Sequence, residues 1–217
     1  MLAAPNRDEL NRRQSLSVSP QQFEQMKRRL AGASRQPRPA VEAGIAPARR
    51  EHELVLGVDP SLRGTGFGIV HSARRALSLV AQGTIKCPPS WERSRCLVRI
   101  AQELRDVIQK HQPTICIIEG LFFAQNLQTA ILMGEARGAS LVAAADAGLE
   151  IYEIAPRKVK QAIVGYGAAQ KLAVAKMVQR MLGLPAPPEP DAADALALAL
   201  AHLQEQSRYS LTSPKKI

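Results

Sequence analysis

Four acidic residues stand where apolar segments of the chain begin or end. Asp59 and Glu119 each follow a short apolar run, and Asp191 and Asp194 open a stretch rich in Ala and Leu. A charge at the end of a buried segment is costly unless something compensates it. A divalent cation bound by all four acids would do so, and the pattern therefore favours a metal-dependent enzyme.

The spacing of the four acids fits one shared site. Asp191 and Asp194 are three residues apart and would share one face of a helix. Carboxylates packed together raise one another's pKa unless cations hold them. Ligands that are all oxygen favour Mg²⁺ or Mn²⁺ over zinc. Two such ions can activate a water and stabilise the leaving oxygen of a phosphodiester.

Each acid also has a purely structural interpretation. Asp191 could cap a helix, Asp194 could be a favourable charge in the first helical turn, and Asp59 could start a turn. Glu119, after four apolar residues, is harder to explain in this way. All four being structural at once is improbable. The glycines of residues 64–68 could cradle a phosphate or form a hairpin, and we favour the hairpin.

The formal net charge of +10 suits a polyanionic partner such as nucleic acid, although a basic surface can also be merely solvated. Residues 1–52 carry 10 basic and 5 acidic side chains, and residues 53–217 carry 19 and 14, so the charge does not reside in one segment. A basic protein with an all-carboxylate metal site is most simply a nuclease.

Other classes of protein are disfavoured. No apolar run is long enough to cross a bilayer, and the polar N-terminus lacks the apolar core of a signal peptide. A cytoplasmic location is the default expectation. The three cysteines have no CxxC spacing and the four histidines are scattered, which argues against a zinc site or a disulfide framework.

The chain divides by composition into three parts. Residues 1–52 are rich in Arg, Pro, Gln and Ser, and we predict a basic, disordered extension with one short helix starting at Pro20. Residues 53–206 form the predicted folded domain, and residues 207–217 are predicted to be a flexible tail. The extension could add DNA affinity, bind a partner, or have no folded role.

Periodicity within the folded domain predicts an α/β fold with a mixed five-stranded sheet. Three antiparallel strands come first, and strands then alternate with helices. The predicted strands are 54–58, 67–71, 77–86, 114–118 and 150–154, and the predicted helices are 91–111, 126–147, 156–164, 169–182 and 191–204. Sites in such sheets lie at the carboxyl ends of the parallel strands, where Asp59 and Glu119 fall.

Four segments together resemble the motifs of RuvC-type Holliday junction resolvases, in the order that this family has them. The segments are 57–68, 118–126, 155–171 and 191–197, and the resemblance covers about residues 54–203. It implies a ribonuclease-H-like fold, a homodimer, and Mg²⁺-dependent cleavage of four-way DNA junctions by paired symmetric nicks. A RuvAB-type branch-migration complex is an implied partner.

The resemblance also implies roles for individual residues. The family's four metal-binding carboxylates fall on Asp59, Glu119, Asp191 and Asp194, with two Mg²⁺ ions per site that Mn²⁺ can replace. Its base-stacking phenylalanine falls on Phe122, and its DNA-contacting lysines fall on Lys160 and Lys171. Arg137 is a further candidate, either for DNA contact or for helix packing.

Three competing functions have their own discriminators. Another nuclease of the same fold would prefer linear duplex, single strands or RNA hybrids to a four-way junction. A junction-binding protein without activity would not need four acids. A phosphotransferase of the actin and sugar-kinase type would need a second phosphate loop and a larger, two-lobed chain, and the sequence shows no such loop.

Overall fold

The computed structural model describes residues 54–74, 76–120, 126–207 and 214–217, together with Pro20, Gln21, Glu24 and Lys27. The chain separates into two compact units, Met1–Arg49 and Arg50–Ile217. In the first unit the four described residues are helical, as the predicted helix from Pro20 requires, and Lys27 pairs with Glu24 at 3.4 Å. Within the described residues, no helix combines the length and apolar character of a membrane span.

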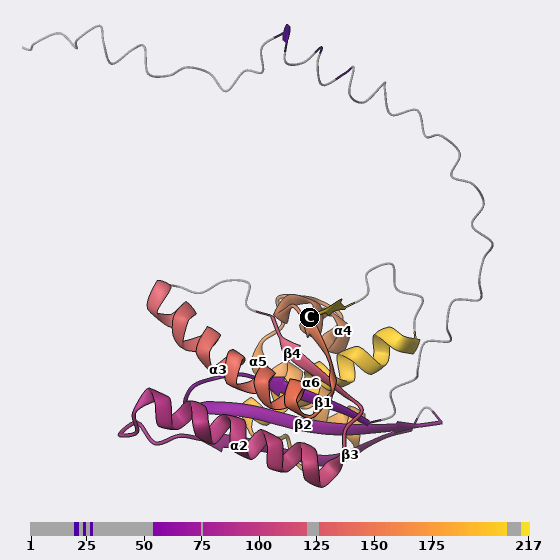
Figure 1. Cartoon of the computed structure of the whole chain (residues 1–217). Helices are drawn as coiled ribbons and strands as arrows, with labels where there is room; N and C mark the ends of the chain where they lie inside the picture. Colours follow the sequence, from indigo (N-terminus) through magenta and orange to yellow (C-terminus); the bar gives the residue numbers. More distant parts are fainter. Residues whose placement is uncertain are drawn as a thin grey trace, which may run out of the picture. The chain divides into compact units, whose positions relative to one another are not determined.

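The second unit is built on a six-stranded sheet in the order β3-β2-β1-β4-β5-β6 (Figure 1). The first three strands form the predicted antiparallel meander, and β1, β4 and β5 run parallel. The strands are β1 (Leu54–Asp59), β2 (Gly64–Ala73), β3 (Ala76–Lys86), β4 (Ile115–Glu119), β5 (Glu150–Ile154) and β6 (Lys215–Lys216). The five predicted strands are therefore all present, in the predicted mixed arrangement.

The sixth strand was not predicted, and it lies in the segment that we expected to be a flexible tail. Lys215 and Lys216 pair antiparallel with β5, and Lys216 forms an ion pair with Glu150 at 3.1 Å. The backbone N–H of Ile217 donates to the carbonyl of Ile151. This short strand satisfies part of an otherwise unpaired sheet edge.

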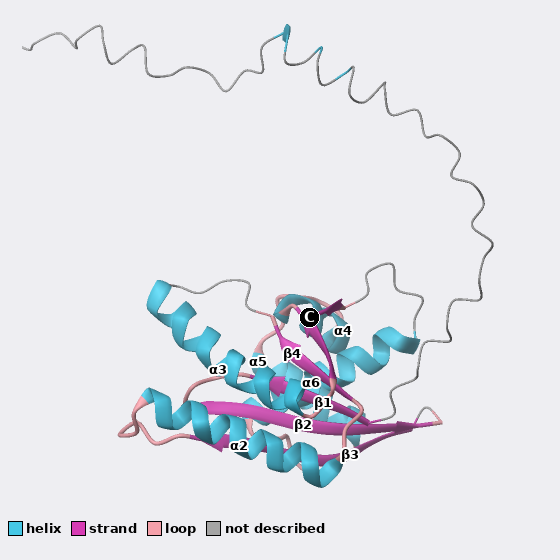
Figure 2. Ribbon diagram, viewed as in Figure 1, coloured by secondary structure: helices cyan, strands magenta, loops and turns pink. Residues whose placement is uncertain are grey.

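Helices cover both faces of the sheet (Figure 2). One layer packs α2 and α3 on the sheet, and the other packs α4, α5 and α6 on the opposite face. The helices are α2 (Arg93–His111), α3 (Leu127–Asp146), α4 (Pro156–Val164), α5 (Lys171–Leu182) and α6 (Pro190–Ser207). All five predicted helices are present, with ends that differ by up to three residues.

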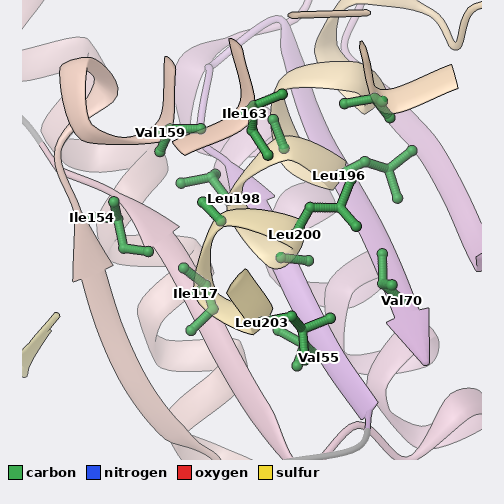
Figure 3. Packing of buried hydrophobic residues seen from close by; sticks show 14 of the residues in the cluster. Val55, Val70, Ile117, Ile154, Val159, Ile163, Leu196, Leu198, Leu200 and Leu203 are labelled. Carbon is green, nitrogen blue, oxygen red and sulfur yellow. The ribbon is translucent and has the colours of Figure 1, made fainter. Parts of the chain in front are cut away.

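Strand alternation divides the core into two apolar clusters. On β4, Ile115 and Ile117 pack toward α6, whereas Cys116 and Ile118 pack toward α2 and α3. Both faces are buried, which explains why this strand reads as a continuous apolar run. Figure 3 shows the α6 side, where Leu196, Leu198 and Leu200 interdigitate with residues of β1, β2, β4 and α4.

Helix α6 lies unusually close to the sheet because glycines remove the side chains between them. A Cβ atom at Gly57 of β1 would overlap the carbonyl of Ala195, and one at Gly66 of β2 would overlap the carbonyl of Asp191. At Gly68, the cross-strand partner of Gly57, a Cβ would lie 2.6 Å from the Leu196 side chain. Glycines within strands often mark such a close backbone approach.

We expect Gly57→Ala to lower the free energy of unfolding by about 3 kcal/mol, because α6 must shift to admit the methyl group. Gly83→Ala on β3 is the matched control, since its methyl group would meet only the ring of Phe67, at 2.8 Å, which can rotate away. We expect it to cost less than about 1 kcal/mol. Urea unfolding measures both, and equal losses would contradict the proposed contact.

Candidate active site

Asp59 and Glu119 end two neighbouring parallel strands on the same face of the sheet. Val58 pairs with Ile118, so the two acids that follow them stand at the same level of β1 and β4. Side chains alternate along a strand, and Val58 and Ile118 pack toward α2 and α3. Asp59 and Glu119 therefore face the α6 side. Both are half-buried.

Helix α6 brings the other two acids to this edge. The amide of Ala193 donates to the carbonyl of Glu189 at 2.8 Å, so the helix is capped at Glu189 and Pro190 occupies its first position. Asp191 consequently lies inside the first turn, not at the N-cap that was its alternative interpretation. Its carboxylate lies against the start of β2, where a Cβ at Gly64 would come within 2.7 Å of Oδ2.

Burial and mutual repulsion raise the pKa of both strand-end acids. Burial, with the charge of Asp59 adding to it, raises the pKa of Glu119 to about 8. Burial, with the charge of Asp194 adding to it, raises the pKa of Asp59 to about 6. The two side chains share a hydrogen bond that raises the pKa of Glu119 and lowers that of Asp59. A hydrogen bond between two carboxyl groups requires that they share one proton.

Lys171 neutralises Asp194, the second of the two acids on α6. It is the first residue of α5, and its Nζ lies 2.7 Å from Oδ2 of Asp194. The hydrogen bond to Asp194 raises the pKa of Lys171, against a smaller opposing effect of burial. The lysine side chain is 69% exposed, so solvent weakens this ion pair. Asp194 is only 20% exposed, so the ammonium group can leave it readily only when another cation takes its place.

The donor set fits a hard divalent cation, although the side chains are not arranged around one. Among the described residues, no three His, Cys, Asp or Glu side chains stand close enough to hold a single ion. Four carboxylates nevertheless supply only oxygen ligands, which suit Mg²⁺ and Mn²⁺. The proton shared by Asp59 and Glu119 and the ammonium group of Lys171 act here as the positive charges that the acids require.

The turn after Asp59 is fastened by a residue that sequence reasoning did not select. Thr65 is fully buried, and its Oγ1 donates to the carbonyl of Ser61 at 2.6 Å and accepts from the amide of Ser61 at 3.2 Å. The glycines of residues 64–68 lie in β2, and Gly66 and Gly68 pair with β1, as the hairpin interpretation predicts. The available signal was a threonine between two glycines, Gly64 and Gly66, directly after the turn.

The candidate DNA-contacting residues fall in different places. Phe122 lies outside the described residues. Lys160 lies on α4, half-buried, and α4 packs on α5 and α6. Lys171 lies among the acids, as described above. Arg137 lies on α3, in an ion pair with Glu153 of β5.

Comparisons with known proteins agree with this geometry. A family model described as crossover junction endodeoxyribonuclease RuvC matches residues 55–202. The crossover junction endodeoxyribonuclease RuvC of Akkermansia muciniphila is 45% identical over 149 residues, which are 69% of this chain and 89% of that protein. The solved structure of T. thermophilus RuvC in complex with Holliday junction substrate has a TM-score of 0.70 and 34% identity, and the match covers 76% of this chain and 100% of that one.

A more distant structure, the yeast mitochondrial Holliday junction resolvase, shares the fold at 10% identity and a TM-score of 0.54. That match covers 88% of this chain and 88% of the yeast protein. Together with the RuvC structures, the strand order confirms the predicted ribonuclease-H-like fold.

We expect the metal-free protein to lose stability as pH rises from about 4 to about 8. The folded-state pKa values of Asp59 and Glu119 lie above their ordinary values, so the folded protein binds more protons than the unfolded one in this window. Glu119→Gln should therefore flatten the fall in Tm and raise Tm at about pH 8. Thermal unfolding in a chelator tests this, with the exposed Asp106→Asn as control. A pH dependence unchanged by Glu119→Gln would refute the expectation.

Proposed function

This chain belongs to the RuvC family of crossover junction endodeoxyribonucleases, and from that premise we propose that it resolves four-way DNA junctions by paired symmetric nicks. It is a nuclease, and the observation that carries its chemistry is the group of four acids at the carboxyl ends of β1 and β4 and the start of α6. Recombination and repair of DNA in the cytoplasm provide such junctions. We assign the nuclease domain to residues 53–206, and residues 1–52 form an extension outside it.

We propose that cleavage depends on Mg²⁺, which Mn²⁺ can replace, with two ions held by Asp59, Glu119, Asp191 and Asp194. Bound ions of this kind supply an activated water and stabilise charge on the leaving oxygen. Asp59 and Asp194 are proposed to serve the water side, and Glu119 and Asp191 the leaving-group side. The charge of Asp194 acts on the pKa of Asp59, and this proximity supports placing these two acids on the same side.

The chain's own cations are proposed to hold the DNA. Lys171 would leave Asp194 for a phosphate when a bound ion takes its place on that carboxylate, because the lysine side chain itself is largely exposed. Lys160 on the neighbouring helix is the second proposed phosphate contact, and Phe122 is proposed to stack on unpaired bases near the crossover. The net charge of +5 on residues 53–217 supports association with the junction. A RuvAB-type complex is a proposed partner.

Paired nicks on a two-fold junction require two sites, and we propose that a second copy of this chain provides the other. Helix α3 offers a surface for it. Ile131 and Val142 are 47% and 52% exposed, and the glycines at 134 and 138 on the same stripe leave open space above the helix backbone. Small residues flanked by apolar ones allow helices to approach closely, and symmetric contacts of this kind form C2 dimers.

We expect Asp59→Asn and Glu119→Gln each to abolish cleavage of a synthetic junction in Mg²⁺ while leaving junction binding intact. Removing an acid leaves the phosphate contacts in place. Asp106→Asn is the control, because Asp106 is exposed on α2, on the other face of the sheet. Nick mapping on all four strands, with linear duplex and an RNA–DNA hybrid as competitors, measures substrate choice. Normal cutting by either acid variant would overturn the assignment.

We expect Val142→Glu to convert the protein to a monomer and to replace paired nicks by single, uncoordinated ones. A charge within an apolar interface must be desolvated on association. Val98→Glu on the outer face of α2, at 55% exposure, is the matched control and should leave the dimer intact. Sedimentation velocity and nick mapping report the two effects. A dimer that survives Val142→Glu would exclude α3 as the interface.

A further inference from the structure

Arg137 projects from α3 toward the sheet face opposite the four acids. On β5, Ile151 packs toward α2 and α3 whereas Ile154 packs toward the α6 side. By alternation Glu153 faces α3, where it forms its ion pair with Arg137. The acids lie on the α6 face. Arg137 is therefore behind the site, separated from it by the thickness of the sheet.

The guanidinium group of Arg137 joins two strands. One nitrogen pairs with Oε2 of Glu153 on β5, and Nε–H points to the backbone carbonyl of Glu119 on β4 at 3.4 Å. The second contact is long, so the ion pair is the stronger of the two. A planar fork with several donors can make both contacts at once, which a lysine cannot.

These contacts lie where the β4 ladder ends. The amide of Gly120 donates to the carbonyl of Ile154 at 3.0 Å and is the last backbone link between β4 and β5 on the described chain. The carbonyl of Glu119 is the adjacent group, and Arg137 is the donor directed at it. The arginine thus holds the residue whose side chain, on the other face, bonds to Asp59.

Burial argues against a role for Arg137 at the DNA surface. The side chains of Arg137 and Glu153 are only 16% and 19% exposed. Moving the guanidinium group to a phosphate would leave the carboxylate of Glu153 half-buried and without its partner, which is costly. By contrast, Arg105 on α2 and Asp146 on α3 form a comparable pair that is 42% and 57% exposed and lies away from β4.

We propose that Arg137 and Glu153 are a positioning pair, which fixes the carboxyl end of β4 so that the Glu119 side chain faces Asp59, and that Arg137 does not contact DNA. This inference rests on the proposed function of the acids. Of the two alternatives for Arg137, DNA contact and helix packing, it favours the packing contact, and this contact places the Glu119 side chain.

The test compares Arg137→Gln, Glu153→Gln, the double variant and Arg105→Gln. For Arg137→Gln we expect a single-turnover cleavage rate about 10- to 100-fold lower, as for other groups that orient metal ligands. Junction Kd without divalent metal should stay within about twofold, with an unchanged salt slope. The rise in Tm on adding Mg²⁺ to metal-free protein should shrink. Arg105→Gln should match the wild type in all three measurements.

Coupling within the pair is read from the double variant. Because Arg137 and Glu153 act as one unit, the double variant should be no slower than Arg137→Gln alone. Arg137→Lys should cut at an intermediate rate, since an ammonium group keeps the ion pair but cannot also reach the Glu119 carbonyl. If Arg137→Gln fails to fold, the double variant, which has no unpaired charge, takes its place in every comparison.

Three results would overturn the proposal. A weaker Kd with a salt slope reduced by about one, at an unchanged single-turnover rate, would make Arg137 a phosphate contact. An unchanged rate together with an unchanged Kd would give it no role in the site. Additive losses in the double variant would show that the two residues are not a pair. A wild type that does not cut junctions would refute the proposed function, whereas the Mg²⁺-induced rise in Tm would still report whether Arg137 positions Glu119.

Discussion

Helix α6 rests on the backbone of β1 and β2, and the geometry of the acidic site follows from this contact. Gly57, Gly66 and Gly68 place no side chain between helix and sheet, and a Cβ at any of them would overlap atoms of α6. The first turn of α6 then meets the end of β1 at the level of Asp59. A bulkier residue at these positions would lift Asp191 and Asp194 away from the strand ends.

The same contact brings four carboxylates together, and their mutual repulsion is offset by a proton and by the ammonium group of Lys171. Asp59 and Glu119 share a proton, and Lys171 binds Asp194. Both can be exchanged near neutral pH, because burial raises the pKa of Glu119 only to about 8 and the lysine is mostly exposed. A site that is destabilised in this way is ready to exchange both for divalent ions. Lost stability at such a site is the usual counterpart of activity.

The two faces of the sheet carry different groups of functional residues. The α6 face carries the acids and Lys171, whereas the α2 and α3 face carries the Arg137–Glu153 pair and the exposed apolar stripe of α3. Helix α3 therefore connects the surface proposed for a second copy with the end of β4. In such an arrangement, dimer formation and the placement of Glu119 depend on the same rigid helix.

Local patterns in the sequence determined the strands, the helices and the four acids, because burial periodicity and the ends of apolar runs are properties of neighbouring residues. They also placed Asp59 and Glu119 at strand ends, which the structure confirms. Three features were decided only by the tertiary structure. They are the packing of α6 on the strand glycines, the sixth strand at the β5 edge, and the ion pair of Arg137. Each joins residues from separate elements, and no local pattern specifies which distant group will fill the space beside a glycine, a strand edge or a charge.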